Sequence, residues 1–317
     1  MKVLRGIGIT LMVVAAAALI LLLFSFVNHR IRLDREEQLL QSADLGRAVE
    51  VNGHLMNVYQ EGDGEETLVF LSGGGTSSPV LDFRSLYSLL RDDYRIAVVE
   101  KAGYGLSDIS GEASRDIGTI LEETREALKL SGIEGSYVLL PHSMSGIEAL
   151  YWAQTYPEEV RAIVGLDMAF PAVYQDYPIN MGLIRLTAFG ARIGVTRLIP
   201  GVAESDAIRY GTLTAEEEAL YRAIFYRRTA TPDMLNEVAE IKTNAALVGA
   251  GTRPAQPMLV FSSNGEGTGW DEADWRAAQK SFAKEMNAAL VELDCSHYVH
   301  DIEYERIAAE IARFLEG

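Results

Sequence analysis

One stretch, Ser136–Gly146 (SYVLLPHSMSG), constrains the fold of this chain more than any other. It begins with a short, uninterrupted apolar run, Tyr137–Leu140, of the kind that forms a strand buried on both faces. The chain then turns abruptly through residues 141–145 and enters a helical pattern at Gly146. Ser143 stands in the middle of the turn, so a buried strand, a sharp turn and a helix would together present one serine hydroxyl.

The same alternation of strand and helix continues through most of the chain. Helical patterns with one apolar face, such as Ile117–Leu130, separate short apolar runs. Strands that alternate with helices at this spacing predict an α/β fold with a mainly parallel sheet covered by helices on both faces. An Asn52–Gly53 pair between two runs also predicts a hairpin near the start. The predicted strands are 48–51, 55–59, 67–71, 94–99, 137–140, 160–166, 257–261 and 289–293.

The alternation is interrupted by a helical segment from about Phe170 to Arg253. Within it, Thr214 and Glu217 form a capping-box pattern, and Thr231 precedes a proline that opens another helix. Because the strand pattern resumes afterwards, we interpret the segment as a helical lid inserted into one sheet. The alternative is a second, independent domain.

The amino-terminal run Gly6–Val27 is uncharged and rich in aliphatic residues. As a helix it would span roughly 30 Å, the thickness of the hydrocarbon core of a bilayer. A cleaved signal peptide would normally have a shorter apolar region and a small-x-small cleavage site, which residues 24–28 do not offer. We therefore predict an uncleaved transmembrane anchor at 6–27, after a short tail at 1–5 and before a charged juxtamembrane stalk at 28–45.

The positive charges on the two sides of that anchor are nearly balanced, so they hardly favour either orientation in the membrane. Lys2 and Arg5 precede the run, and Arg30, Arg32 and Arg35 follow it. The positive-inside rule then gives only a small preference. We predict a single-pass protein of the cell membrane with a cytoplasmic amino terminus and an extracytoplasmic catalytic domain, which occupies 46–317.

Composition excludes several classes of function. The net charge of −17 argues against a nucleic-acid partner, which would need a basic face to neutralise phosphates. The single cysteine, Cys295, excludes a disulfide framework and a thiolate metal cluster. A chain of 317 residues with 48% hydrophobic content is long enough and apolar enough for a large globular domain.

Ser143 needs a general base before its hydroxyl can act as a nucleophile. His297 follows the last predicted strand, and a loop there can reach the end of the sheet that carries the serine. We predict His297 as the base; His300 is the alternative base, although we favour a structural role for it. The remaining histidines are His29, His54 and His142.

The base in turn needs a carboxylate that orients its ring. Glu266 is the first carboxylate after the strand 257–261 and is the predicted acid. Asp167, at the end of the strand 160–166, is the main alternative. Asp271 is a third candidate, although its position is that of a helix cap.

Acyl transfer also needs backbone amides directed at the developing oxyanion. Met144, the residue after the serine, would supply one amide. Gly74, in the glycine-rich loop 72–78, would supply the other. This loop lacks the Gly-Lys-Ser/Thr ending of a P-loop and the spacing of a dinucleotide fingerprint, so nucleotide binding is not predicted.

With these parts in the order oxyanion loop, nucleophile, acid and base, the chain resembles the α/β-hydrolase superfamily. It is most similar to the lid-bearing branch that includes lipases, esterases, prolyl aminopeptidases and cofactor-free haloperoxidases. The resemblance covers about 49–315 and implies an eight-stranded, mainly parallel sheet with an inserted helical lid, here preceded by a transmembrane helix. Its carriers are Leu71–Gly75, the Gly-Tyr-Gly-Leu-Ser loop at Gly103–Asp108, Pro141–Gly146 and Ser296–His297.

The resemblance implies a membrane-anchored serine hydrolase. Ser143, His297 and Glu266 would form the triad, and an acyl-enzyme would form on a carboxylic ester or amide of a small or lipid-like substrate. No metal or organic cofactor is implied. The alternatives are an aminopeptidase or cofactor-free perhydrolase on the same scaffold, or a non-enzymatic, hydrolase-like ligand receptor.

Four residues depart from the usual pattern of the family. Ser72 stands in place of histidine, Glu100 and Glu266 each stand in place of aspartate, and Pro141 stands in place of a glycine. Ser145 occupies the second small position of the turn, where glycine is also usual. None of these changes removes a required catalytic group, but together they leave the substrate unassigned.

Overall fold

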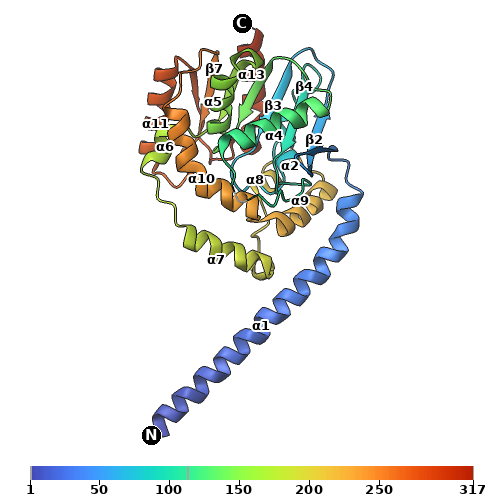
Figure 1. Cartoon of the computed structure of the whole chain (residues 1–317), viewed down its shortest axis with the longest axis vertical. Helices are drawn as coiled ribbons and strands as arrows, with labels where there is room; N and C mark the ends of the chain where they lie inside the picture. Colours follow the sequence, from blue (N-terminus) through green and yellow to red (C-terminus); the bar gives the residue numbers. More distant parts are fainter. Residues whose placement is uncertain (1, 113, 317) are drawn as a thin grey trace.

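The chain forms one eight-stranded sheet with helices packed on both faces, and a long helix, α1, projects from it (Figure 1). The computed structural model describes residues 2–112 and 114–316. The strands follow in the order β1-β2-β4-β3-β5-β6-β7-β8 across the sheet. This arrangement confirms the predicted α/β fold. The strands are β1 (Arg47–Val51), β2 (His54–Glu61), β3 (Thr67–Leu71), β4 (Arg95–Glu100), β5 (Tyr137–Pro141), β6 (Val160–Leu166), β7 (Met258–Ser262) and β8 (Ala289–Glu292).

All neighbouring strands from β4 to β8 pair in parallel, whereas β1 and β2 are antiparallel additions at one edge. The β1–β2 hairpin closes through Asn52 and Gly53, whose φ angles are 52° and 83°. Both central residues of such a two-residue turn need positive φ, which confirms the predicted hairpin. Because β5, β6 and β7 are adjacent and parallel, the loops after their carboxyl ends meet at one edge of the sheet.

Two hydrophobic cores lie on the two faces of the sheet. One is covered by α4 (Ile117–Leu130), α5 (Ser145–Thr155) and α11 (Glu272–Met286). The other is covered by α2 (Pro79–Asp82), α3 (Arg84–Tyr87), α12 (Val299–Ile302) and α13 (Tyr304–Glu316). The strands β3, β5 and β7 between these cores are buried on both faces, and for this reason their sequences are continuous apolar runs.

Between β6 and β7 the chain makes a helical insertion, as the sequence predicts. The capping box of Thr214 and Glu217 is present at the start of α9, and the Thr231 hydroxyl accepts from the amide of Met234 at the start of α10. The insertion consists of α6 (Pro171–Gln175), α7 (Met181–Arg192), the 3-10 helix η2 (Val195–Leu198), α8 (Asp206–Arg209), α9 (Ala215–Arg228) and α10 (Pro232–Gly249).

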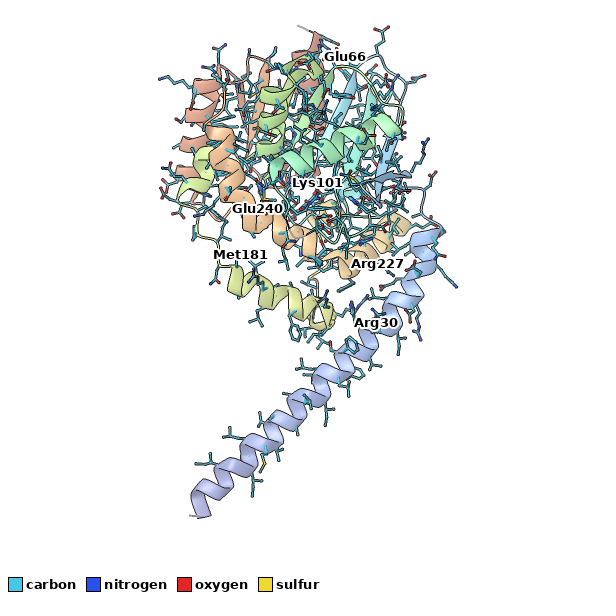
Figure 2. The ribbon with its side chains drawn as sticks, viewed as in Figure 1. Arg30, Glu66, Lys101, Met181, Arg227 and Glu240 are labelled. Atoms are coloured by element: carbon cyan, nitrogen blue, oxygen red, sulfur yellow. The ribbon has the colours of Figure 1, made fainter. Side chains whose placement is uncertain are left out.

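The amino-terminal helix α1 extends from Lys2 to Gln41 without interruption. It therefore includes most of the predicted tail, the predicted anchor and most of the predicted stalk. Residue 1 of the predicted tail and residue 317 of the predicted catalytic domain lie outside the described residues. Its apolar part is exposed and long enough to cross a membrane. Its carboxyl-terminal part packs on α9 and η2, where Arg30 of α1 lies close to Arg227 of α9 (Figure 2).

Candidate active site

The turn at Ser143 is a strained connection between β5 and α5. Ser143 has a φ of 55°, in the left-handed region that residues with a side chain rarely occupy. The Ser145 hydroxyl holds the turn by donating to the carbonyls of Leu71 (2.6 Å) and His142 (2.9 Å). A Cβ on Gly146 would lie 2.0 Å from the carbonyl oxygen of Ala169, so glycine is required there. The strain directs the Ser143 side chain outward from the edge of the sheet.

His297 lies against this serine, with its Nε2 2.8 Å from Ser143 Oγ. Its other ring nitrogen, Nδ1, lies 2.6 Å from Oδ2 of Asp167. The three residues come from the carboxyl ends of β5 and β6 and from the loop after β8. The sequence analysis therefore placed Ser143 and His297 in the same site as the structure does.

Asp167 is fully buried and is surrounded by hydrogen-bond donors. Its Oδ1 accepts from the amide of Ser263 (2.7 Å) and from the indole Nε1 of Trp275 (2.8 Å). Its Oδ2 accepts from the Ser263 hydroxyl (2.7 Å) in addition to His297. Four donors compensate the desolvation of one carboxylate and fix its orientation toward the imidazole. Ser263 and Trp275 are thus site residues that the sequence analysis missed.

The predicted contact between Glu266 and His297 through the glutamate side chain is wrong. Glu266 is exposed, and only its backbone carbonyl meets the histidine, by accepting from the amide of His297 at 2.8 Å. The reason is that Glu266 sits between Gly265 and Gly267, both with positive φ, in a loop that carries its side chain to the surface. Asp271, the third candidate, is the residue before α11, as a helix cap would be.

Both predicted oxyanion donors lie near the serine turn: Met144 follows Ser143 directly, and Gly74 follows Gly73, where a Cβ would lie 2.8 Å from Ser143 Cβ. A Cβ on Gly74 would lie 2.5 Å from Met144 Cε, so the glycine loop rests directly on the residue after the nucleophile. Among the described residues, neither the amide of Gly74 nor that of Met144 has a hydrogen-bond acceptor. An oxyanion site requires such backbone donors near the nucleophile, and these two lie on the residue after the serine and on the adjacent glycine loop.

The glycine loop is held in place through the insertion. The amide of Gly75 donates to the Tyr104 hydroxyl (3.3 Å), and that hydroxyl donates to Oε2 of Glu237 on α10 (2.6 Å). Lys101 pairs with the other oxygen of Glu237, and all three side chains are buried. Tyr104 belongs to the Gly103–Asp108 loop, so this motif connects the oxyanion loop to α10.

Behind the site, His142 packs against both His297 and His300, with ring centroids 4.6 Å apart in each pair. Its Nε2 lies 3.2 Å from the carbonyl oxygen of His297. Burial, with contributions from the two neighbouring histidines, lowers the pKa of His142 well below its usual range. A neutral His142 can therefore support the loop of His297 without adding charge beside it.

The buried cluster of Asp82, His300 and Asp301 could hold a metal ion, because its ligand atoms lie within 4.8 Å of one another. His300 Nε2 donates to Asp82 (3.0 Å), and the Tyr221 hydroxyl also donates to Asp82 (3.2 Å). Neither oxygen of Asp301 has a hydrogen-bond partner among the described residues. Burial, followed by the charge of Asp82, raises the pKa of Asp301 well above its usual range. Either a proton on Asp301 or a bound metal ion would therefore relieve the repulsion between the carboxylates of Asp82 and Asp301.

Replacement of Asp301 by asparagine tests this protonation. Between the ordinary aspartate pKa and the raised pKa of Asp301, the folded state binds more protons than the unfolded state, so stability falls as the pH rises. We expect Asp301→Asn to reduce this slope and to raise Tm at neutral and alkaline pH, in thermal melts across a pH series. Asp294→Asn, at an exposed carboxylate, is the control. A chelator-sensitive Tm together with a less stable Asp301→Asn would instead assign the cluster to a metal.

Comparison with known proteins agrees with this fold. Residues 66–188 match the family model described as alpha/beta hydrolase fold. The Bacillus subtilis (strain 168) "Uncharacterized protein YbdG" is 37% identical over 315 residues, which cover 96% of this chain and 95% of that protein. The chain belongs to the α/β-hydrolase family.

Solved structures of α/β hydrolases superpose on most of the chain. The epoxide hydrolase of Bacillus megaterium is 16% identical and gives a TM-score of 0.66 over 86% of this chain and 100% of its own. A carboxylesterase of the thaumarchaeon Nitrososphaera gargenis is 14% identical. It gives a TM-score of 0.59 over 85% of this chain and 98% of its own. At these identities the likeness shows the fold and leaves the substrate open.

Proposed function

We propose that this α/β hydrolase is a membrane-anchored serine hydrolase that cleaves a carboxylic ester or amide through an acyl-enzyme. The observation that carries the proposal is the continuous line of contacts from Ser143 Oγ through His297 to Asp167, at 2.8 Å and 2.6 Å. Asp167 takes the role for which the sequence analysis selected Glu266. The amides of Gly74 and Met144 complete the constellation as oxyanion donors.

In the proposed mechanism, the Ser143 oxygen attacks the substrate carbonyl while His297 Nε2 takes the hydroxyl proton. Asp167 keeps the Nδ1 proton in place and stabilises the imidazolium that forms. The tetrahedral oxyanion is stabilised by the amides of Gly74 and Met144. The C–O or C–N bond then breaks as His297 gives its proton to the leaving group. A water molecule releases the acid by the same steps, with His297 again as base.

The serine also favours carbonyl substrates over epoxides or haloalkanes. Alkylation of a hydroxyl at Ser143 would leave an ether, which water and a general base do not cleave, whereas an acyl ester is readily hydrolysed. Ser143 therefore supports turnover only if the substrate carries an acyl group. For this reason we infer ester or amide cleavage, although relatives of the same fold include an epoxide hydrolase.

The anchor and the lid are part of the same proposal. Helix α1 contains an apolar stretch that is not buried against the rest of the described chain and is long enough to cross a bilayer, which suits a membrane helix. We propose that it spans the cell membrane once, with the catalytic domain on the extracytoplasmic side. The insertion α6–α10 then acts as a lid, and small or lipid-like acyl compounds are the proposed substrates.

The full chain in detergent micelles tests the reaction class. We expect a fluorophosphonate probe to label the protein and peptide mass spectrometry to place the adduct on Ser143. A panel of p-nitrophenyl esters, aminoacyl p-nitroanilides, an epoxide and a haloalkane should give turnover on the esters or the anilides alone. Turnover confined to the anilides would favour an aminopeptidase. Absence of both label and turnover would favour a ligand receptor.

A further inference from the structure

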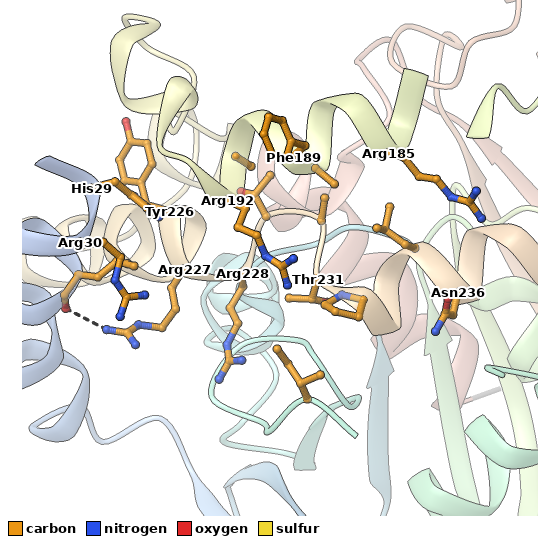
Figure 3. Close-up of a pocket in the computed structure, with 18 of the residues that line it drawn as sticks. His29, Arg30, Arg185, Phe189, Arg192, Tyr226, Arg227, Arg228, Thr231 and Asn236 are labelled. Carbon is orange, nitrogen blue, oxygen red and sulfur yellow. Dashed lines mark hydrogen bonds between the residues drawn. The ribbon is translucent and has the colours of Figure 1, made fainter. Parts of the chain in front are cut away.

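A cavity of about 610 Å³ lies between α1, α7 and the junction of α9 and α10 (Figure 3). Its polar lining is strongly basic and, among the described residues, includes no carboxylate. This is unexpected in a chain whose net charge is −17. The arginines that line it are Arg30, Arg185, Arg192, Arg227 and Arg228.

Most of these cations have no charged partner in the described part of the chain. Arg30, Arg185 and Arg192 have no carboxylate within the 4.0 Å of an ion pair, whereas Arg227 pairs with Glu37 at 2.7 Å. Arg228 donates only to the carbonyl of Gly105 (2.7 Å), and its burial lowers its pKa. Arg227 and Arg228 are partly buried, whereas Arg30, Arg185 and Arg192 are exposed. Guanidinium groups that share one cavity without carboxylate partners repel one another and attract an anion, and their planar donors suit the oxygens of a phosphate.

The cavity also has an apolar side, formed in part by Leu33, Ile109 and Leu235. Helix α7, which forms one wall, exposes Leu183 (59%) and Leu186 (65%) outside the cavity, while Phe189, which is 58% exposed, lines the cavity with the arginines of α7. Exposed apolar residues together with arginines on one helix are typical of a helix that lies in the plane of a membrane surface.

The segment that follows α7 contacts α1, and these contacts place the end of α7 at the level where the apolar run of α1 ends. The Ser25 hydroxyl of α1 donates to the carbonyl of Ile193 (3.1 Å), just after α7. Gly194 follows, and a Cβ there would lie 2.4 Å from Cβ of His29. Arg197 then binds both oxygens of Glu36 at 2.8 Å and 2.6 Å. Because Ser25 is inside the apolar run and His29 follows it, the end of α7 is fixed at the expected bilayer surface, on the side from which α1 projects (Figure 1).

We propose that α7 lies in the head-group region of the membrane and that the arginine-lined cavity binds the phosphate of an anionic glycerophospholipid. The lipid's acyl chains would pass along the apolar face of α7 toward the bilayer. In Figure 3, Arg30 and Arg192 reach the cavity from α1 and α7, whereas the guanidinium of Arg227 on α9 donates to the carbonyl of Leu33 on α1 (2.9 Å). A phosphate bound by Arg30 and Arg192 would therefore link the anchor to the insertion. This inference rests on the proposed anchoring by α1, and it adds a lipid site to the proposed hydrolase.

The test measures binding of a fluorescent phosphatidylglycerol to the full chain in neutral detergent by anisotropy. We expect binding of phosphatidylglycerol, much weaker binding of the matching phosphatidylcholine, and competition by inorganic phosphate only at far higher concentration. The double variant Arg185→Gln/Arg192→Gln should bind about 30-fold more weakly, about 2 kcal/mol, since each arginine near anionic lipid contributes on the order of 1 kcal/mol. Arg185→Lys/Arg192→Lys should retain most of the binding.

The control is Arg253→Gln/Arg306→Gln, which removes two exposed arginines outside the cavity and should leave lipid binding unchanged. Equal binding of both lipids, or unchanged binding by the Arg185→Gln/Arg192→Gln variant at unchanged Tm, would overturn the site. If inorganic phosphate bound as tightly as the lipid, the proposal that the bound phosphate belongs to a lipid would be overturned. Flotation of the full chain with liposomes in alkaline carbonate tests the anchor separately, and fluorophosphonate labelling tests the hydrolase separately.

Discussion

Replacement of Ser143 by alanine is expected to lower kcat on the best ester substrate by at least about 10⁴-fold and as much as about 10⁶-fold. The variant keeps the oxyanion amides and the His297–Asp167 pair but has no oxygen that can form the acyl-enzyme. The effect should be confined to turnover, because the Ser143 side chain makes no hydrogen bond other than the one to His297 among the described residues. Steady-state kinetics with equal amounts of folded protein, checked by circular dichroism, measures it.

Ser145→Ala is the matched control, two residues away in the same turn. The Ser145 hydroxyl bonds only to the carbonyls of Leu71 and His142, so its loss should cost about 1 kcal/mol of stability. Activity should remain within roughly tenfold of the wild type, since no reacting group is removed. If Ser143→Ala kept wild-type turnover, the nucleophile would have to be another residue, and Ser145→Ala would show whether it is the neighbouring serine.

The sequence predicted the sheet and the elbow because both depend on local patterns. Five-residue apolar runs such as Thr67–Leu71 and Tyr137–Pro141 are buried on both faces, and few other structures suit such runs between helices. The position of His297 followed from topology, since a loop after the last strand returns to the edge where β5 ends. Ser143 needed only the strand before it and the helix after it.

The carboxylate could not be assigned in the same way. Strands β6 and β7 are neighbours, so the loops after both reach His297, and chain order alone does not choose between Asp167 and Glu266. The choice depends on which carboxylate is buried among donors, and those donors, Ser263 and Trp275, come from the loop after β7 and from α11. A signal was present: Asp167 follows a buried strand directly, whereas Glu266 stands between two glycines in a polar loop.

The contact between α1 and the insertion was missed for a different reason. The segment 28–45 has no strong apolar face, so its hydrophobic pattern predicts an exposed stalk. In the structure it is held largely by charged pairs, with Arg197 on Glu36 and Arg227 on Glu37. Partners more than 150 residues apart, as in these two pairs, leave no periodic pattern in the sequence.

Asp167→Asn is expected to lower kcat by about 10⁴-fold with little change in KM. An asparagine fits the same space, but its NH₂ group can face Nδ1 of His297 and favour the tautomer that carries its proton on Nε2, which cannot accept the proton of Ser143. Glu266→Gln should leave kcat within about twofold, because its side chain is exposed and only its backbone carbonyl contacts His297. Kinetics of both variants on one ester separates the two assignments. A large loss in Glu266→Gln with little loss in Asp167→Asn would restore the glutamate as the acid and would mean that the loop of Gly265–Gly267 moves inward when substrate binds.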